Sequence, residues 1–468
     1  MITVLFDRES GRPLYEQLYR FIRTEIESGR LRPGEKMPSK RRLAMHLKIS
    51  PVTVESAYGQ LTAEGYLRAE PRRGYYVQLM EDPLPPAAPA PTNLIPPAPA
   101  PRPRYAYEFK TRTVDTELFP FATWAKLARE VLAGNREELL NVTHPQGSPA
   151  LRAQIAKYLY HFRGIRADAE QIVVGAGSEY LLGLLVQLTG QTRVYAVENP
   201  GYHKVDRILH RNGVKTVPVP VDEDGLSADA LRRTDADIVH ITPSHQFPTG
   251  VVMPVRRRAA LLNWANEKAG RYILEDDYDS EFRFSGHPIP ALQGLDQAGK
   301  VVYLNAFTKS LAPSLRIGYM VLPPALLERY RREFLFYSCT VPNFEQYTLS
   351  RFMASGGFER HLNRMRAAYR ERRDLLAAAI SGGPLSGRVE LVGQDAGLHL
   401  LMRVHNGMDE SRLVAAAKAC GVRVYGLSEY CSPPVPDLPP STVVIGYSNL
   451  RPADIPAAVR LLEQAWAL

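Results

Sequence analysis

The sequence predicts two domains of different fold class, a small α+β domain at the N-terminus and a large α/β domain after it. Three observations lead to this prediction. Residues 1–78 contain three short amphipathic segments followed by two strand-like runs. A segment of 24 residues with ten prolines then separates this region from the rest of the chain. Beyond it, short apolar runs alternate with helical segments, which is typical of a mostly parallel sheet with helices on both faces.

Length and composition exclude several classes of protein. The 468 residues are 45% hydrophobic and 23% charged, as in a globular protein and unlike a collagen-like or wholly disordered chain. Cys339, Cys420 and Cys431 are too few for a disulfide framework and lack the spacing of a metal site. Since no leader segment opens the chain and no apolar run approaches 18 residues, we expect a cytoplasmic protein without a membrane contact.

Positive charge is concentrated at the N-terminus. The formal net charge is +9, and residues 1–78 contain 14 Lys and Arg against 9 Asp and Glu. Such an excess favours a polyanion as partner, because contacts to phosphate release counterions. A solvated basic surface would have the same composition, so charge by itself does not decide between the two interpretations.

Three helices are predicted in the first 65 residues. The first has its apolar residues at helical spacing, namely Leu14, Leu18, Phe21, Ile22 and Ile26. A second helix begins after Ser39 as its cap. A third begins after Ser50, with Pro51 in its first position, where a missing N–H costs nothing. Val54, Ala57, Tyr58 and Leu61 give this third helix one buried face.

Two strand-like runs, residues 66–69 and 75–78, are joined by Pro71-Arg72-Arg73-Gly74 and form a basic hairpin. Three helices with a tight turn between the last two, followed by a hairpin, form a winged helix-turn-helix. In that fold the third helix enters the major groove of double-stranded DNA and the hairpin contacts phosphate or the minor groove. The residues we predict to bind DNA are Ser39, Arg41, Ser50, Thr53, Ser56, Arg72, Arg73 and Gly74.

The segment resembles the GntR-type winged helix over residues 12–78. The matching stretches are Pro38-Ser39-Lys40-Arg41-Arg42-Leu43-Ala44, Val52-Thr53-Val54, Ala57-Tyr58 and Leu61-Thr62-Ala63-Glu64-Gly65-Tyr66-Leu67. One position departs from the family, because Pro51 stands where an arginine is usual, and a bidentate contact to guanine is unavailable there. Specificity then depends on Arg41, Thr53, Ser56 or the hairpin. We expect Glu55 to be solvated rather than bonded to a cytosine.

Residues 80–104 form the predicted linker. Proline fixes φ and lacks an N–H group, so neither a helix nor a sheet continues through this segment. We expect an extended spacer of about 3.1 Å per residue. The chain is thus predicted to divide into a DNA-binding domain (1–79), a linker (80–104) and an effector domain (105–468).

Five strand-like runs are predicted in the large domain, at residues 171–174, 194–197, 237–242, 272–275 and 301–306. Ligands of such sheets bind at the carboxyl ends of the strands. The first run is followed by Gly175-Ala176-Gly177-Ser178-Glu179, which suits an anion at a helix N-terminus, although such a turn is more often plain geometry. The run of acids from Glu275 to Glu281 is costly without a cationic partner.

One ligand explains the residues that follow these runs. Pyridoxal 5′-phosphate (PLP) needs an amine for a Schiff base, a carboxylate at its pyridine nitrogen, a ring to stack on and a cradle for its phosphate. We predict Lys309 as the amine, Asp276 as the pyridine partner, Tyr202 as the stacking ring and Tyr278 as a partner of the phenolic oxygen. The predicted phosphate ligands are Gly177, Ser178, Glu179 (through its backbone or its side chain), Thr308 and Arg316.

The order of these segments resembles the fold-type I aminotransferases over residues 105–468, most closely at residues 242–250, 273–282 and 309–319. Together with the GntR-type head, the whole chain resembles the MocR-type transcriptional regulators. The resemblance implies a small C-terminal α+β subdomain, a head-to-tail, domain-swapped homodimer and PLP bound as an internal aldimine. It also implies an aminotransferase-like domain that acts as a sensor rather than as an enzyme.

The strand Val443-Val444-Ile445-Gly446-Tyr447 departs from the aminotransferase pattern. Val444 stands where an arginine usually binds the substrate carboxylate with two hydrogen bonds. Lys204 and Arg207 are candidates to compensate, although a lysine has no fork geometry. Our hypothesis is that the effector is PLP itself or an amine without a carboxylate.

The predicted function is that of a PLP-dependent regulator that binds operator repeats and controls genes of vitamin B6, amine or amino-acid metabolism. Two alternatives stay open. The first is a working aminotransferase with a DNA-binding arm, against which the missing arginine argues. The second is a dimerisation scaffold without a cofactor, against which the presence of both Lys309 and Asp276 argues, since a buried unpaired charge is costly.

Overall fold

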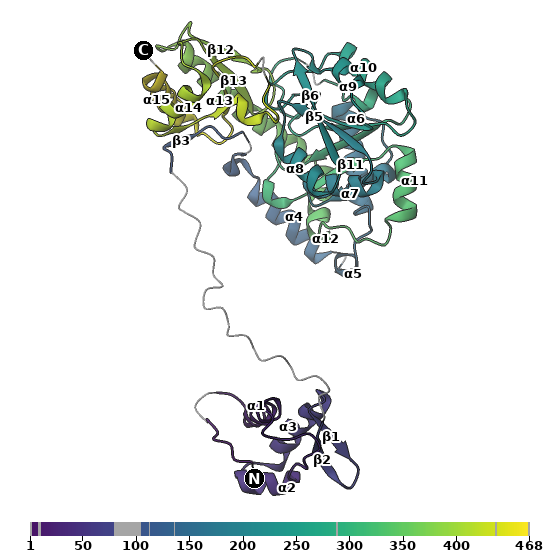
Figure 1. Ribbon diagram of the computed structural model, residues 1–468. Helices are drawn as coiled ribbons and strands as arrows, with labels where there is room; N and C mark the ends of the chain where they lie inside the picture. Colours follow the sequence, from purple (N-terminus) through teal and green to yellow (C-terminus); the bar gives the residue numbers. More distant parts are fainter. Residues whose placement is uncertain are drawn as a thin grey trace. The chain divides into compact units, whose positions relative to one another are not determined.

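The computed structural model describes residues 2–7, 11–78, 104–111, 113–134, 136–286, 289–435 and 438–466. They belong to two compact units, one within residues 1–101 and one within residues 102–468 (Figure 1). The predicted linker lies outside the described residues, except for Arg104. Within the described ranges, no helix is long and apolar enough to cross a membrane.

The N-terminal unit contains three helices and a hairpin. The helices are α1 (Leu14–Glu27), α2 (Lys40–Leu47) and α3 (Pro51–Ala63), and β1 (Leu67–Glu70) pairs antiparallel with β2 (Gly74–Val77). The apolar faces predicted from helical spacing form its core, in which Leu18, Ile22, Val54, Tyr58 and Leu61 are fully buried. The predicted winged helix-turn-helix is confirmed, with each strand displaced by one residue.

Hydroxyl caps fix the starts of α2 and α3. Ser39 accepts a hydrogen bond from the backbone N–H of Arg42 at 3.3 Å, and Ser50 accepts one from Thr53 at 3.1 Å. A cap of this kind contributes about 1 kcal/mol to helix stability. The Ser50 cap lies in the turn between α2 and α3 and therefore helps to fix the orientation of α3.

The large unit is built on a mixed sheet of eight strands. Their order across the sheet is β4 (Ile172–Gly175), β11 (Gly318–Val321), β10 (Val301–Ala306), β9 (Tyr272–Asp276), β8 (Ile238–Ile241), β5 (Val194–Asn199), β6 (Lys215–Asp222) and β7 (Gly225–Leu226). The central strands from β10 to β6 are parallel, whereas β11 is antiparallel to both of its neighbours. All five predicted strands are present, within two residues of the predicted limits.

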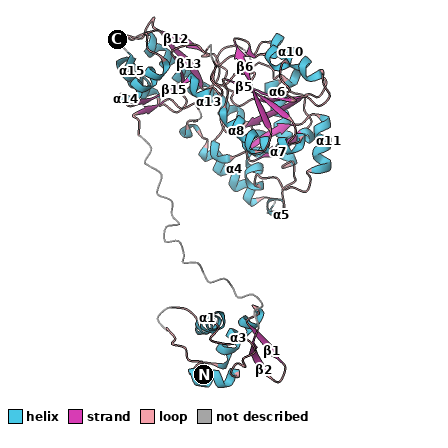
Figure 2. Cartoon of the chain, viewed as in Figure 1, coloured by secondary structure: helices cyan, strands magenta, loops and turns pink. Residues whose placement is uncertain are grey.

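Helices cover both faces of this sheet (Figure 2). One face packs against α7 (Ser178–Thr189), α8 (His203–Arg211) and α11 (Pro324–Glu333), and the other against α9 (Ala228–Arg232) and α10 (Val255–Asn266). Adjacent residues of one strand point to opposite faces, so Leu274 and Ile273 of β9 belong to different clusters. A third cluster joins α4 (Phe121–Ala133), α6 (Pro149–Arg163) and α12 (Asn343–Ala354), and α5 (Arg136–Leu140) lies beside α4 and α12.

The C-terminal subdomain is a four-stranded antiparallel sheet backed by helices. Its strands, in order, are β12 (Val389–Val392), β13 (His399–Val404), β16 (Thr442–Gly446) and β15 (Tyr425–Gly426). They pack against α13 (Gly357–Ser381), α14 (Glu410–Ala419) and α15 (Ile455–Trp466). Beside them β3 (Tyr107–Glu108) pairs in parallel with β14 (Val422–Arg423), which attaches the start of the unit to this subdomain.

Candidate functional site

A cavity of about 210 Å³ lies at the carboxyl ends of β5, β8, β9 and β10. Its lining includes eight of the nine residues that we predicted for the cofactor, namely Tyr202, Asp276, Tyr278, Lys309, Ser178, Glu179, Thr308 and Arg316. The ninth, Gly177, lies against Arg316, since a Cβ atom on Gly177 would stand 2.8 Å from an Arg316 nitrogen. The parallel topology thus brings together residues that are far apart in the chain.

Lys309 follows β10, and its side chain is almost fully buried. Its Nζ donates a hydrogen bond to the backbone oxygen of Thr111 at 2.9 Å. Thr111 follows β3, so the segment attached to the C-terminal subdomain also contacts this amine. Thr111 was not predicted, because the contact joins residues 198 positions apart and uses only a backbone atom of Thr111.

Asp276 is the last residue of β9 and faces the cavity. Its Oδ2 lies 3.2 Å from Nε2 of His240, which is buried on the neighbouring parallel strand β8. The contact fixes the orientation of the carboxylate. His240 also lines the cavity and was not predicted, because a histidine inside a strand is usually a core residue and has no motif around it.

A tight turn between β4 and α7 forms the end of the cavity where we predicted the phosphate. Gly177 has a φ of +86°, which an L side chain rarely adopts, and a Cβ atom on Gly318 would stand 3.1 Å from the Cα of Gly177. Arg316 crosses this turn and donates to the backbone oxygen of Ala176 at 3.2 Å. Helix N–H groups beside a guanidinium are suited to a phosphate.

The sequence left open whether Glu179 would contact the phosphate through its backbone or through its side chain. Its carboxylate pairs with Lys204 and lies 3.8 Å from Arg316. The hydrogen bond from Lys204 is the main cause that lowers the pKa of Glu179 below its ordinary value. Because an anionic carboxylate repels a phosphate, the backbone N–H is the group of Glu179 that can contact one.

Aromatic rings form one wall of the cavity. Tyr202 immediately precedes α8, and its ring contacts Phe247 edge to face, with centroids 5.7 Å apart. Phe247 lines the cavity as well, and its contribution was not predicted. On the same side Val444 of β16 is buried against Phe247, Leu427 and Tyr430. Val444, which stands where we expected a carboxylate-binding arginine, is therefore part of an apolar cluster that reaches the cavity through Phe247.

The acidic segment after β9 has the cationic partner that its burial requires. Nε of Arg163, at the end of α6, lies 2.8 Å from Oδ2 of the buried Asp277. Burial first, and then the charge of Asp277, raise the pKa values of Glu275 and Glu281 to about 7. We predicted that the acidic segment needs a cationic partner, but the sequence did not show which residue it is, since Arg163 is distant in the chain.

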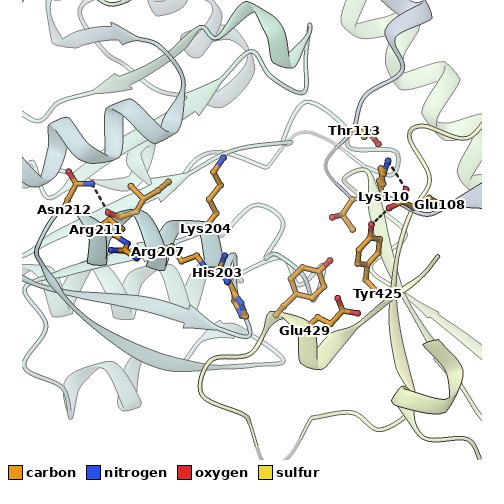
Figure 3. A pocket seen from close by; sticks show the side chains of 13 residues that line it. Glu108, Lys110, Thr113, His203, Lys204, Arg207, Arg211, Asn212, Tyr425 and Glu429 are labelled. Atoms are coloured by element: carbon orange, nitrogen blue, oxygen red, sulfur yellow. Dashed lines mark hydrogen bonds and ion pairs between the residues drawn. The ribbon is translucent and has the colours of Figure 1, made fainter. Parts of the chain in front are cut away.

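A larger cavity of about 1010 Å³ adjoins the first and shares Thr111 and Lys204 with it (Figure 3). One wall is α8, which contributes His203, Lys204, Arg207 and Arg211. The opposite wall includes Glu108, Lys110, Tyr425 and Glu429. Lys204 and Arg207 were the two candidates to replace the missing arginine. Lys204 lines both cavities, whereas Arg207 lines the larger cavity and not the Lys309 cavity.

The N-terminal half of α3 presents a polar surface in the N-terminal unit. Ser56 and Val52 are exposed, and Thr53 is half-buried with its Oγ1 2.9 Å from the hydroxyl of Ser50. Glu55 is exposed, as we expected of a solvated carboxylate, and it also forms an ion pair with Lys40. A contact to a cytosine would have to break this pair.

The other predicted DNA-binding residues flank α3. Arg41 of α2 is exposed, whereas the hydroxyls of Ser39 and Ser50 already serve as helix caps. Arg72 and Arg73 are exposed at the tip of the hairpin, with Arg72 and Gly74 in the left-handed region at φ of +64° and +114°. Glu70 lies 3.8 Å from Arg73, a weak pair at this exposure, so both guanidinium groups are available to phosphates.

The fold and the two sites define a DNA-binding protein with an aminotransferase-like domain, and comparisons agree with this class. Residues 14–77 match the gntR family of bacterial regulatory proteins, and residues 112–434 match the class I and II aminotransferases. The described fold is similar to the crystal structure of a multiple substrate aminotransferase from Thermococcus profundus. That similarity has a TM-score of 0.66 at 25% identity and covers 77% of this chain and 90% of that one.

Full-length relatives narrow the class to one family. The chain is 38% identical to the uncharacterized HTH-type transcriptional regulator YdeL of Bacillus subtilis, over 100% of both proteins. It is 33% identical to the probable rhizopine catabolism regulatory protein MocR of Rhizobium meliloti, over 99% of this chain and 96% of that protein. It is 31% identical to the pyridoxine biosynthesis regulator PdxR of Corynebacterium glutamicum, over 88% of each. The chain belongs to the MocR-type family of transcriptional regulators.

The cofactor of the aminotransferase-like domain is PLP, and the residues of the cavity fit it. The lining supplies an amine, a carboxylate, two phenol groups and a guanidinium. The turn at Gly177 is so close to Arg316 and Gly318 that a side chain there would fill the place of an anion. These groups are the ones that the aldehyde, ring nitrogen, phenolic oxygen and phosphate of PLP require.

Proposed function

We propose that this protein regulates transcription by binding DNA with an affinity that depends on what occupies the Lys309 cavity. One observation supports the proposal most strongly. An amine, a carboxylate, aromatic rings and an anion-binding turn converge in one cavity of a chain that also contains a winged helix. We assign residues 1–79 to DNA binding, 80–104 to a linker and 105–468 to effector binding and dimerisation.

The nine predicted cofactor residues each have a specific task in this proposal. Lys309 binds the aldehyde of PLP covalently, and Asp276 keeps the pyridine nitrogen protonated. Tyr202 packs on the ring, and Tyr278 binds the phenolic oxygen. The phosphate is held by the backbone of Gly177, Ser178 and Glu179, the hydroxyl of Thr308 and the guanidinium of Arg316. When bound, PLP supplies an aldehyde carbon that exchanges between Lys309 and other primary amines.

The apolar cluster around Val444 supports an effector that is PLP itself or an amine without a carboxylate. An α-carboxylate placed against Val444, Phe247 and Tyr430 would lose its hydration without gaining a guanidinium. The nearby cation Lys204 is paired with Glu179. An ordinary α-amino acid is therefore a poor effector, and micromolar conversion of the bound PLP by such amino acids would contradict this assignment.

We further propose that the protein is a head-to-tail homodimer. We also propose that it acts on the nucleoid in the cytoplasm and that it is not an enzyme. Phe121, Leu132, Leu140 and Val142 on and after α4 and α5 are large apolar residues exposed to solvent, as expected of a surface that pairs with a second copy. Two heads on one dimer would bind two operator repeats. We expect the two heads of the dimer to adopt more than one arrangement. An effector then regulates DNA binding only if it binds one arrangement more tightly than another.

Selection of genomic fragments tests the function directly. Wild-type protein would be mixed with sheared genomic DNA, with and without added PLP, and the bound fragments sequenced. We expect a small set of promoters with repeated half-sites, whose enrichment changes with PLP in the wild type but not in Lys309→Ala. Turnover of an amino donor with an oxoacid, together with binding that ignores PLP, would instead favour the aminotransferase alternative.

A further inference from the structure

Next to Tyr278 lies a buried group of two histidines and a carboxylate that the proposed function does not use. His245, Asp279 and His399 are each at most 2% exposed, and one ligand atom from each lies within 4.8 Å of the others. His245 and Asp279 belong to the large domain, whereas His399 is the first residue of β13 in the C-terminal subdomain. Burying a polar atom without a hydrogen-bond partner is energetically costly. The hydrogen bonds of these three side chains therefore indicate which of their atoms have a hydrogen.

The contacts of His245 indicate which ring nitrogen has the hydrogen. Its Nδ1 lies 3.0 Å from Oδ2 of Asp279. A carboxylate only accepts, so this contact places the hydrogen on Nδ1. The other nitrogen, Nε2, is buried and has no hydrogen-bond partner among the described residues. A hydrogen on Nε2 would be buried without an acceptor, and both facts favour the neutral ring protonated at Nδ1.

This tautomer decides where the hydroxyl hydrogen of Tyr278 can go. The Tyr278 oxygen lies 3.1 Å from Nδ1 of His245 and donates to the backbone oxygen of His245 at 3.0 Å. Because Nδ1 already has a hydrogen, it cannot accept the one from Tyr278. That hydrogen is left for the backbone oxygen or for an oxygen placed in the cavity that Tyr278 lines. An unprotonated Nδ1 would compete for it.

The C-terminal subdomain holds the His245 ring in place. Nε2 of His399 donates to the backbone oxygen of Pro248 at 3.2 Å, and the two imidazole centroids are 4.7 Å apart. Burial first, and then the nearby His245 and Lys309, hold the pKa of His399 well below its ordinary value, so this ring is neutral. Gly397 packs so closely that a Cβ atom on it would stand 1.9 Å from Cε1 of His245.

We propose that Asp279 and His399 are positioning residues for the cofactor. Asp279 fixes the His245 tautomer that leaves the Tyr278 hydrogen available to the phenolic oxygen of PLP, and His399 holds His245 from the C-terminal subdomain. The inference rests on the proposed binding of PLP beside Tyr278. It also links β13 to the cofactor, because a movement of this strand would release the His245 ring.

The first test replaces Asp279 by asparagine. Asp279→Asn replaces the anion that holds the hydrogen on Nδ1 of His245 by a neutral amide, so the tautomer with an unprotonated Nδ1 becomes more populated and competes for the Tyr278 hydrogen. The phenolic oxygen then loses a donor that stabilises its anionic form. We expect folded protein that binds PLP, with the pH midpoint of its visible absorption raised by about one unit, as in Tyr278→Phe. The double variant should show no further shift, since both changes remove one interaction.

A matched control is Glu281→Gln, which makes the same change on the same segment at a buried residue. Glu281 contacts Tyr158 at 3.3 Å rather than His245, and its variant should keep the wild-type midpoint.

The second test compares His399→Leu with His399→Gln. We expect the leucine to weaken PLP binding about fivefold, and the glutamine, which can still donate near the position of Nε2, to restore most of it.

The outcomes separate this inference from the proposed function. A wild type that stays colourless with added PLP overturns the proposed function and this inference with it. A coloured wild type whose midpoint is unchanged in Asp279→Asn overturns only the positioning role. One zinc or iron ion per purified chain, lost in Asp279→Asn, would also overturn it, because Asp279 and His245 would then be metal ligands.

Discussion

The DNA-binding unit and the Lys309 cavity place their functional groups in opposite ways. In the former, the predicted contact residues lie between positions 39 and 74, and most of them are exposed. In the latter, the lining residues come from positions 111 to 316, and many are buried. An exposed group needs only an anchored backbone, whereas a buried polar group also needs partners that replace water. Changes in the cavity should therefore have larger effects than changes in the head.

Loss of the cavity amine should have the largest effect. Lys309→Ala removes the proposed covalent attachment, so no PLP should stay on the chain after borohydride reduction and denaturation, although the protein stays folded by circular dichroism. Lys300→Ala is the control, because Lys300 lies at the other end of β10 and donates to the backbone of Lys268. PLP that is still fixed in Lys309→Ala would assign the attachment to another residue.

Removal of a buried ion-pair partner should lower stability strongly. Arg163→Met leaves Asp277 buried without its cation, and we expect the free energy of unfolding to fall by about 3–5 kcal/mol. Urea unfolding of the full chain measures this loss. Arg331→Met, which breaks an exposed pair with Glu170, should cost less than about 1 kcal/mol. Equal losses would mean that burial does not distinguish the two pairs.

Loss of the predicted pyridine partner should weaken the cofactor without removing it. Asp276→Asn replaces a charge-assisted hydrogen bond by a neutral one, so we expect the Kd for PLP to rise roughly tenfold to a hundredfold. Titration by visible absorption measures the change. Asp237→Asn should leave the Kd unaltered, because that carboxylate pairs with Lys268 and lies just before β8, away from the cavity. Wild-type affinity in Asp276→Asn would remove the role of Asp276.

The buried acids should make the free energy of unfolding depend on pH. Burial, followed by the charge of Asp277, raises the pKa of Glu281 to about 7 from an ordinary value of 4.5. Between these values the folded protein binds more protons than the unfolded one. The contribution of Glu281 to stability therefore falls as the pH rises from 5 to 7, by up to about 1.4 kcal/mol per pH unit. The stability of Glu281→Gln relative to wild type should rise over this range in urea unfolding, and a constant difference would contradict the raised pKa.

The smallest effect is expected at the exposed hairpin. Arg73→Ala should weaken binding to all DNA sequences alike and reduce the slope of log affinity against log salt by about one, since it removes one phosphate contact. Fluorescence anisotropy at several salt concentrations measures this slope. Arg30→Ala removes an exposed guanidinium that pairs with Glu25 and should change little. In both variants the PLP absorption should stay that of the wild type, and a change would indicate coupling between the two regions.

Much of the fold could be predicted because local patterns specify it. The caps at Ser39 and Ser50, the proline at position 51 and the apolar spacing of α3 each act within one turn of helix. Five of the eight strands of the large sheet were predicted within two residues, because each of the five is a short apolar run that ends at polar residues. The residues that follow these runs then predicted eight of the groups that line the cavity.

Other features required the folded chain. Arg163, His240 and Thr111 contact the predicted residues but stand in segments with no motif of their own. The ion pair between Glu55 and Lys40 joins two helices and could not be predicted from the pattern of either helix by itself. The pairing of Glu179 with Lys204, which favours its backbone over its side chain as a phosphate ligand, likewise joins residues that spacing does not relate.

The amino-acid sequence by itself predicted the two fold classes, Lys309 as the cofactor amine and Val444 in place of an arginine, because each prediction depends on residue type and on spacing along the chain. Only the tertiary structure decided which groups neutralise, orient or cover those residues. The physical reason is that burial and short-range contact, on which ion pairs and hydrogen bonds depend, arise between strands and helices that are distant in the sequence.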